Sequence, residues 1–362
     1  MGRSRHVAPN PKSILIIRLS AIGDNVMATP LIRAFRLKYP NARIDWLAQP
    51  ECIELVAHHP DLNDALTWPT RQLKKLAKAN KWTTFFREWR QAIKKVRSGK
   101  YDWIVDTQGL LKSGIIARLS GAKYIIGLGP REGSQYLVHD QVPKIHGKPR
   151  ISSEYLDLAE YLDLPCEPFA MELHCSKASQ QAAETTIKEF SLENGFVSIC
   201  PFTTRPQKHW VEQHWIDFIN RWYARTSIPC VMLGGPGDKE ASGRIETGVT
   251  EPSSVINLAG ERFLSIPDVA AFIGRNNLLI GVDTGMTHMS IAHQKPTICI
   301  FGSTVPYTET HTPNVKIHYQ ALNCAPCRKH PTCNGAYDCM RMVTPEMILQ
   351  SALELYPKAS KS

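Results

Sequence analysis

The sequence lacks any apolar run near the roughly 18 residues that a membrane-spanning helix needs. Its N-terminal apolar stretch, residues 14–17, is followed at once by Arg18 and is too short for the core of a secretory signal peptide. The glycine patterns of dinucleotide-binding and P-loop proteins are also missing, as are an Asp-x-Asp motif and short-period repeats. We therefore expect a cytosolic protein that uses neither of those nucleotide-binding loops.

Acidic residues are scarce in one segment only. Residues 71–100 hold eleven Lys or Arg and a single acid, Glu88, whereas the other 332 residues carry 32 side chains of each sign. The formal net charge of +10 therefore comes from this one segment. The chain of 362 residues is 43% hydrophobic, which predicts two globular domains and excludes a disordered or fibrous protein.

Short β-branched runs alternate with helical patterns along most of the chain. This alternation predicts an α/β protein with parallel sheets. We expect domains at residues 1–170 and 171–343, followed by a C-terminal helix and tail at 344–362, in which Thr344 caps a helix over 345–355. Two doubly wound domains facing each other would form a cleft at the carboxyl ends of their strands. The predicted strands are Ile14–Ile17, Ile44–Leu47, Trp103–Val105, Tyr124–Ile126, Phe196–Ile199, Cys230–Leu233, Val255–Leu258, Leu278–Val282 and Thr297–Phe301.

The first predicted strand runs into a small-residue turn, with the sequence ILIIRLSAIGD over residues 14–24. Asp24 ends this turn, and we expect the next helix to begin near Asn25. A carboxylate at this place can cap the helix. It can equally act as a general base in a ligand site at the sheet edge.

The loop after the predicted strand at 196–199 is rich in hydroxyls and cations. Thr203, Thr204, Arg205 and Lys208 lie just beyond the strand, before a helix-like sequence. Two hydroxyls, an ammonium and a helix N-terminus suit a diphosphate. A capped helix with a solvated basic edge explains the same residues.

A third polar loop follows the strand at 278–282. Asp283, Thr284 and His288 precede a helix there, and Gly281 and Gly285 permit tight turns. Because three such loops occur in one α/β chain, two of them in the same half, the pattern favours a site for a nucleotide sugar.

Five segments in this order resemble the ADP-heptose:lipopolysaccharide heptosyltransferases of glycosyltransferase family 9. The resemblance extends over roughly residues 13–350 and implies a GT-B fold, with two Rossmann-like, doubly wound domains facing a central cleft. It places the acceptor on the N-terminal domain and the nucleotide sugar on the C-terminal domain. It implies inverting transfer that needs no cofactor for catalysis. The matching segments are RLSAIGDNVMATP (18–30), YDWIVDTQGLLKSG (101–114), TTRPQKHW (203–210), GGPGDKE (234–240) and GVDTGMTHMSIA (281–292).

The resemblance also implies roles for single residues. Asp24 matches the catalytic base, and Lys208 matches the cation that stabilises the leaving diphosphate. The other implied donor contacts are Thr203, Thr204, Asp283, Thr284, Gly285 and His288. The implied acceptor contacts are Asp106, Gln108, Lys112 and Arg131.

The implied reaction moves a heptose from ADP-heptose to the phosphorylated Kdo-lipid A inner core of lipopolysaccharide. Such an enzyme would be cytoplasmic and peripheral to the inner membrane. One alternative is a protein O-heptosyltransferase of the type that modifies autotransporters. The other, from a different class, is a non-catalytic protein that binds a nucleotide sugar or an anionic lipid.

Four of the ten cysteines lie within sixteen residues, at Cys324, Cys327, Cys333 and Cys339. Four thiolates at this spacing can form a tetrahedral site for structural zinc or iron in the loop 324–339. Some relatives of the autotransporter-modifying type carry a cysteine-ligated iron near this region. The alternative is that the cluster consists of reduced, unpaired thiols or adventitious disulfides.

The basic segment 71–100 has helically spaced apolar residues, and its cations fall largely on the opposite face. This pattern is typical of a helix that packs by one stripe. The charge also favours attraction to an anion, such as a membrane surface or a phosphorylated lipid. No recognised nucleic-acid-binding motif accompanies it, which disfavours nucleic acid as a partner. The stripe is formed by Trp82, Phe85, Phe86, Trp89, Ile93 and Val96.

Overall fold

The computed structural model of the protein describes residues 10–145, 147–328 and 330–356. The chain forms two compact units. Unit 1 comprises Met1–His146 and Ser152–His174, and unit 2 comprises Gly147–Ile151 and Cys175–Ser362. The short segment Gly147–Ile151 is held within unit 2 because the Ile151 N–H donates to the Glu309 carbonyl at 2.8 Å.

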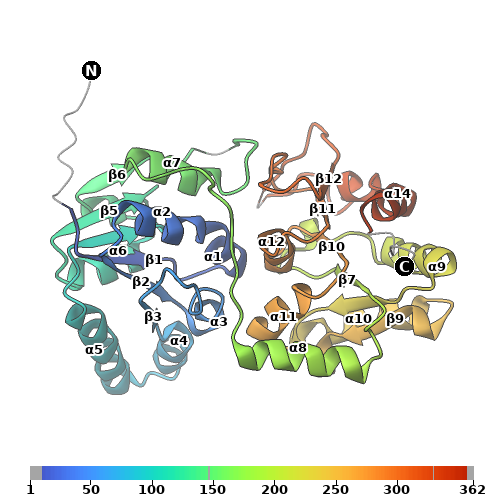
Figure 1. Ribbon diagram of the computed structural model, residues 1–362, viewed down its shortest axis with the longest axis horizontal. Helices are drawn as coiled ribbons and strands as arrows, with labels where there is room; N and C mark the ends of the chain where they lie inside the picture. The colour runs from blue at the N-terminus through green and yellow to red at the C-terminus, as the bar shows by residue number, and fades with distance from the viewer. Residues whose placement is uncertain (1–9, 146, 329, 357–362) are drawn as a thin grey trace. The chain divides into compact units, whose positions relative to one another are not determined.

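Unit 1 is built on a parallel sheet of six strands (Figure 1). Their order is β3-β2-β1-β4-β5-β6, so the chain moves outward from β1 first in one direction and then in the other. This order is that of a doubly wound dinucleotide-type fold, with its topological switch point between β1 and β4. The strands are β1 (Ser13–Ile17), β2 (Arg43–Ala48), β3 (Asp64–Thr67), β4 (Trp103–Asp106), β5 (Tyr124–Leu128) and β6 (Asp140–Val142).

Unit 2 repeats this topology with different sequence. Its six parallel strands have the order β12-β11-β10-β7-β8-β9, and the switch point falls between β7 and β10. Both sheets therefore open ligand-binding crevices at equivalent places. The strands are β7 (Val197–Cys200), β8 (Cys230–Leu233), β9 (Val255–Leu258), β10 (Leu278–Val282), β11 (Thr297–Phe301) and β12 (Val315–Tyr319).

Helices follow the strands in both units. None of the helices in the described part of the chain combines the length and apolar character that a membrane span requires. In unit 1 they are α1 (Ile22–Ala28), α2 (Pro30–Lys38), α3 (Pro50–Ile53), α4 (Thr70–Lys78), α5 (Trp82–Ser98), α6 (Leu111–Leu119) and α7 (Ser153–Tyr161). In unit 2 they are α8 (Lys177–Glu189), α9 (Glu212–Thr226), α10 (Lys239–Gly248), α11 (Ile266–Ile273), α12 (Gly285–Ala292), α13 (Asp338–Arg341) and α14 (Pro345–Leu355).

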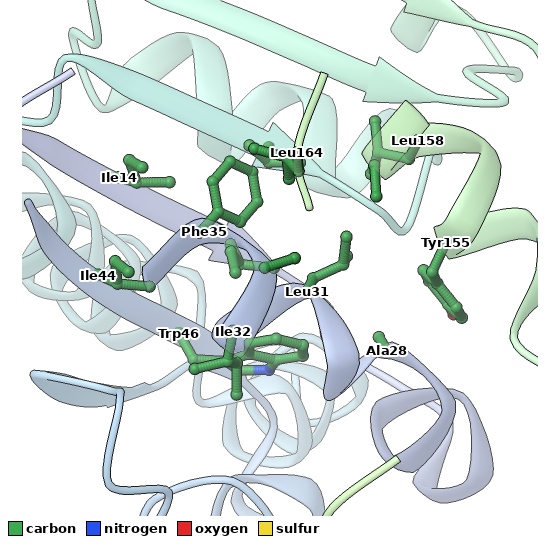
Figure 2. Packing of buried hydrophobic residues seen from close by; sticks show 14 of the residues in the cluster. Ile14, Ala28, Leu31, Ile32, Phe35, Ile44, Trp46, Tyr155, Leu158 and Leu164 are labelled. Atoms are coloured by element: carbon green, nitrogen blue, oxygen red, sulfur yellow. The ribbon is translucent and has the colours of Figure 1, made fainter. Parts of the chain in front are cut away.

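Unit 1 has a hydrophobic core on each face of its sheet, and the larger one lies beneath α2 and α7. Figure 2 shows Phe35 and Leu31 of α2 packed over Ile14 and Ile44 of the sheet, and all four side chains are fully buried. The i, i+4 spacing of Leu31 and Phe35 puts them on one side of α2. This packing holds α1 and α2 against the end of the sheet where the first polar loop lies.

The α/β prediction is confirmed, and all nine predicted strands are present with bounds shifted by at most two residues. Three strands were not predicted, namely β3, β6 and β12. The C-terminal helix is confirmed as α14, and the Thr344 side chain accepts from the Met347 N–H.

Candidate functional site

Apart from Arg131, which follows β5, the candidate catalytic, donor and acceptor residues of each unit lie at or beyond the ends of the two strands that flank its switch point. In unit 1 the loops concerned follow β1 and β4, and in unit 2 they follow β7 and β10. Parallel strands end at the same edge of a sheet, so each pair of loops meets. Arg18, after β1, donates to the Thr107 carbonyl after β4 at 2.6 Å. Lys208, after β7, reaches Asp283 after β10 at 2.5 Å.

Asp24 is held by one of its two carboxylate oxygens. Oδ2 lies 2.5 Å from Nη2 of the buried Arg18 and accepts from the Ala21 N–H at 3.1 Å. Within the described part of the chain, Oδ1 accepts no hydrogen bond, and the side chain is about one-third exposed. Burial alone would raise the pKa of Asp24, but the charge and hydrogen bond of Arg18, the Ala21 N–H and the charge of Lys144 together outweigh burial, and the pKa lies below its usual value. The carboxylate is therefore ionised, oriented and open on one side.

The expected start of the first helix near Asn25 was wrong. Helix α1 begins at Ile22, so Asp24 is the third residue of the helix and bonds back to the Ala21 N–H as in a capping box. Asp24 is therefore not the N-cap of α1, which is Ala21; it lies at the third helical position, and its Oδ2 accepts from the N-cap backbone N–H.

The side chain of Asn25 holds the start of α1 in place through buried hydrogen bonds. Its side chain is fully buried, donates to the Ala21 carbonyl at 2.8 Å and accepts from Trp46 Nε1 at 3.1 Å. Tyr155 of α7 adds a bond from its hydroxyl to the Asp24 carbonyl at 3.3 Å. Because buried polar groups are costly to leave unpaired, these bonds set where α1 begins.

Asp106 was predicted to contact an acceptor, but its carboxylate is fully buried and serves its own loop. One oxygen accepts from the Gln108 and Gly109 N–H groups, and the other from the Ser113 hydroxyl at 2.9 Å. Burial raises the pKa of Asp106 to about 6, against the effect of these hydrogen bonds. Gly109 is required in this loop, because its φ is +64° and a Cβ would lie 2.5 Å from the Leu128 carbonyl oxygen. Asp106 therefore stabilises the loop after β4 by accepting these hydrogen bonds.

The other acceptor-side candidates lie at the surface around this loop. Gln108 accepts from the Ser20 N–H at 3.1 Å and so joins the loops after β1 and β4. Lys112, near the start of α6, is exposed, and desolvation together with nearby Lys74 lowers its pKa. The exposed Arg131 is tethered through its N–H to the Gly109 carbonyl at 2.9 Å.

In unit 2, Asp283 gathers the polar groups of the site. Its Oδ2 accepts from Lys208 Nζ at 2.5 Å and from the Thr304 hydroxyl at 2.7 Å. Its Oδ1 lies 3.6 Å from His288 Nε2. Burial alone would raise the pKa of Asp283, but His288 and Lys208 hold it well below its usual range.

His288 is buried beside Tyr307, whose hydroxyl lies 3.3 Å from Nδ1 of the ring. Thr304 and Tyr307 follow β11, the next strand of the sheet, and neither was predicted as a site residue. The only indication of these two residues in the sequence is that they come shortly after a predicted strand.

Thr203 and Thr204 lie in the loop after β7, with Thr203 partly buried and Thr204 exposed. The helix expected at this loop was misplaced, because the residues after Arg205 form a short 3-10 turn at Pro206–Lys208. Helix α9 starts four residues beyond Lys208 with Glu212 in its first turn, which offsets its dipole.

The glycines of the third loop have different roles from one another. Gly281 was expected in a turn but lies inside β10, where a Cβ would meet the Thr287 hydroxyl at 2.6 Å. Gly285 is the first residue of α12, and Thr284 is its N-cap. The helix N-terminus closest in sequence to Asp283 is therefore that of α12.

The four clustered cysteines are free thiols in the described chain. Burial raises the pKa of Cys339, and Cys324 and Cys327 raise it further, so the sulfur atoms share one neighbourhood. Among the residues that the structure describes, no three of these sulfurs come within 4.8 Å of one another. A metal would require the loop to contract around it.

The basic segment forms two helices in contact, α4 and α5 (Figure 1). A surface hollow of about 450 Å³ is lined by Arg71, Lys74, Lys75, Lys78 and Ala79. Arg71 pairs with Glu51. The three lysines are exposed, and in the described residues no acid lies within ion-pair distance of them.

The predicted apolar stripe of this segment is only partly correct. Val96 is buried, and Phe85, Trp89 and Ile93 pack against the second face of the unit 1 sheet. Trp82 and Phe86 are instead 50% and 56% exposed at the start of α5. Two large aromatic side chains therefore lie at the surface of this basic region.

Two doubly wound units, each with a polar site at its switch point, are the architecture of the GT-B fold. A sequence model of glycosyltransferase family 9 (heptosyltransferase) matches residues 89–338. The chain belongs to this family and is a glycosyltransferase.

Individual relatives agree with this assignment. Lipopolysaccharide heptosyltransferase 1 of Pseudomonas aeruginosa is 25% identical over 322 residues, which cover 87% of this chain and 86% of the relative. Among solved structures, a family 9 glycosyltransferase from Veillonella parvula has a TM-score of 0.79 at 15% identity, covering 95% of this chain and 97% of its own. The ADP-heptose LPS heptosyltransferase II of Escherichia coli has a TM-score of 0.73 at 20% identity, with 95% and 98% covered.

Proposed function

We propose that this glycosyltransferase moves a heptose from ADP-heptose to the phosphorylated Kdo-lipid A inner core of lipopolysaccharide, with inversion at the anomeric carbon. The names of its relatives support the donor and the acceptor class. The observation that carries the mechanism is the asymmetric environment of Asp24, with Oδ2 bound by Arg18 and Oδ1 accepting no hydrogen bond in the described chain.

In this mechanism Oδ1 of Asp24 takes the proton of the acceptor hydroxyl as that oxygen attacks the anomeric carbon. The bond between the sugar and the diphosphate breaks on the opposite face, and ADP leaves with its electrons. General base catalysis of this kind typically contributes about 10²–10⁴-fold in rate. Because Arg18 keeps Asp24 ionised, the base is ready at neutral pH.

Unit 2 binds the donor in this proposal. Lys208 stabilises the negative charge that grows on the diphosphate, and the hydroxyls of Thr203 and Thr204 add hydrogen bonds. Asp283 and His288, with Thr284 and Gly285 at the start of α12, contact the nucleotide and the sugar. No cofactor takes part in this chemistry, because the cation and the hydrogen-bond donors come from the chain itself.

The acceptor is polyanionic, and unit 1 offers matching charge. Lys112 and Arg131 would contact the acceptor beside Asp24, while Gln108 and Asp106 hold the loops that present them. The lysines of α4 would bind more distant phosphates at the cytoplasmic face of the inner membrane. Each basic residue near an anionic surface contributes on the order of 1 kcal/mol, screened by salt.

We further propose a structural metal, zinc or iron, at Cys324, Cys327, Cys333 and Cys339. Thiolates bind either ion well, and a cation would relieve the repulsion that raises the pKa of Cys339. The metal would brace the loop that precedes α13 and take no part in transfer. Metal analysis of protein purified without added metal should find a stoichiometric ion, and a metal-free protein would refute this assignment.

Mass spectrometry of lipopolysaccharide from a strain lacking this protein tests the acceptor. A core truncated within its heptose region is the expected result. An unchanged core, together with loss of heptose from a surface protein, would instead identify a protein O-heptosyltransferase. Absence of ADP release when purified protein is given donor and acceptor would indicate a protein that only binds these ligands.

A further inference from the structure

A second cluster of metal-binding side chains lies in unit 1, away from the residues assigned above. His59 is in the connection between α3 and β3, and Glu172 and His174 are in the last residues of the unit. One nitrogen of each ring and one oxygen of Glu172 all lie within 4.8 Å of one another. In the residues that the structure describes, this is the one group of at least three His, Cys, Asp or Glu side chains gathered so closely.

We propose that His59, Glu172 and His174 bind a divalent transition metal ion, with zinc as the best match. In a tetrahedral zinc site with ligand bonds of about 2.0–2.1 Å, neighbouring ligand atoms lie about 3.4 Å apart. Glu172 Oε2 lies 3.3 Å from His174 Nε2 and 3.7 Å from His59 Nε2. Both distances lie within a few tenths of an ångström of ligand spacing, and the ligand nitrogens of the two rings lie within 4.8 Å of each other.

The state of His59 supports a ligand at this place. Its side chain is 98% buried, and Nε2 has no hydrogen-bond partner although it points toward the Glu172 carboxylate. A buried imidazole nitrogen left unpaired is uncommon, because desolvation without a partner is costly.

Binding through Nε2 has one local consequence. The ring proton moves to Nδ1, which now accepts from the Asp61 N–H at 3.2 Å. That hydrogen bond would be lost, and the turn at residues 59–61 would adjust. Two histidines and one carboxylate would still fill three of four tetrahedral positions and leave one for water.

The metal would hold residues 169–174, the last residues of unit 1, against the rest of the unit. Phe169 and Met171 of this segment are buried in the core, and the Glu172 N–H donates to the Thr29 hydroxyl at 3.1 Å. Thr29 directly follows α1, the helix that carries Asp24. A metal held by Glu172 would thus brace α1 from its C-terminal end, as a structural site and not a catalytic one.

The test must separate this site from the four cysteines. We would titrate untagged protein carrying Cys324→Ser, Cys327→Ser, Cys333→Ser and Cys339→Ser with Zn²⁺ against a chelator of known affinity. We expect one ion per chain, and affinity at least about tenfold weaker after Glu172→Gln or His174→Ala. His58→Ala is the matched control, because His58 is the adjacent histidine and pairs with Glu54 at 3.4 Å. Its affinity should not change.

Co²⁺ provides a second measurement on the chain with its natural cysteines. Thiolate ligands give Co²⁺ a strong near-ultraviolet charge-transfer band that nitrogen and oxygen ligands lack. Co²⁺ at the proposed site should therefore absorb in the visible region without contributing to the near-ultraviolet band. The His174→Ala change should remove this visible absorption and leave the near-ultraviolet band unchanged. Failure of the protein with the four Cys→Ser changes to bind Zn²⁺, or equal binding by its His174→Ala and His58→Ala variants, would overturn the proposal. The cluster would then be a metal-free group of hydrogen-bonded side chains.

Discussion

Arg18 and Asp24 form an ion pair of 2.5 Å within the loop and helix that follow β1, and the pair uses only Oδ2 of the carboxylate. One carboxylate thus has two separate tasks. Oδ2 accepts from the Ala21 N–H and binds Arg18, while Oδ1 is presented at the carboxyl edge of the sheet.

Replacing Asp24 by Asn tests the role of Oδ1. The amide keeps the size of the side chain but cannot accept a proton, so kcat for heptose transfer should fall by about 10²–10⁴-fold. Binding of ADP-heptose, measured by calorimetry, should stay unchanged. A well-folded Asp24→Asn protein with full transfer activity would refute the assignment of Asp24 as base.

Replacing Arg18 by Gln should change the pH dependence of transfer. Without Arg18, burial is less opposed, so the pKa of Asp24 rises and the acid limb of the kcat/KM profile moves to higher pH. Arg18→Lys keeps the charge and should shift the limb less. An identical acid limb in all three proteins would show that this limb does not report Asp24.

The same pair predicts how stability depends on pH. The folded-state pKa of Asp24 is lowered, so the pair stabilises the fold above the unfolded pKa of about 3.9 and loses this effect as pH falls further. Urea unfolding at pH 7 and at pH 3 should therefore show a smaller difference for Arg18→Gln than for the natural protein. An equal pH dependence of the two unfolding free energies would contradict this.

Replacing Lys208 by Met should weaken stabilisation of the leaving diphosphate. We expect kcat to fall by roughly 10²–10³-fold, the usual effect of removing one preorganised group from a site of developing charge. Affinity for ADP should fall as well. Arg225→Met, which removes an exposed cation in the last turn of α9, is the matched control, and an equal loss in both variants would argue against a specific role for Lys208.

Charge reversal on α4 should separate acceptor presentation from donor binding. Lys74→Glu with Lys78→Glu should raise KM for acceptor in anionic vesicles and leave ADP-heptose affinity unchanged. Because exposed charges are screened, the effect should shrink with added salt. Lys177→Glu with Lys188→Glu on α8 changes the net charge equally and should have no such effect. Equal losses in both double variants would point to net charge alone.

The change Asn25→Leu tests how much the buried hydrogen bonds of Asn25 stabilise the fold around α1. The change leaves Trp46 Nε1 without its partner, which should cost about 1–3 kcal/mol of unfolding free energy, whereas the Ala21 carbonyl keeps its bond from the backbone N–H of residue 25. Adding Trp46→Phe to the Asn25→Leu protein removes the unpaired indole N–H. Trp46→Phe should therefore lower the free energy of unfolding less in the Asn25→Leu protein than in the natural protein. Additive costs in the double variant would show that the two side chains do not act together.

The architecture could be predicted from the sequence because buried parallel strands carry continuous β-branched runs. The strands that were missed, β3, β6 and β12, lie at sheet edges, where less burial tolerates polar residues such as the Asp, Lys and His of DALT, DQV and VKIHY. Edge strands of this kind have no distinctive pattern.

The candidate site could be predicted only in part. Residue types at strand ends identified Asp24, Lys208 and Asp283 as candidates. Their partnerships could not be predicted, because the contact between Lys208 and Asp283 joins residues 75 positions apart through the order of strands in the sheet. The burial of Asp106 was missed for a different reason: its partners Gln108, Gly109 and Ser113 are close in sequence, but residue types alone do not show that this loop folds back over the carboxylate.

The assignment of Gly147–Ile151 to unit 2 limits how the enzyme can be dissected. The chain passes between the units three times, so a single cut after His174 would separate unit 2 from the strip that pairs with Glu309. Exchange of donor-binding halves between relatives would therefore have to carry this five-residue strip along with the C-terminal half. A chimera joined only after His174 would combine one relative's unit 2 with the other relative's Gly147–Ile151 segment.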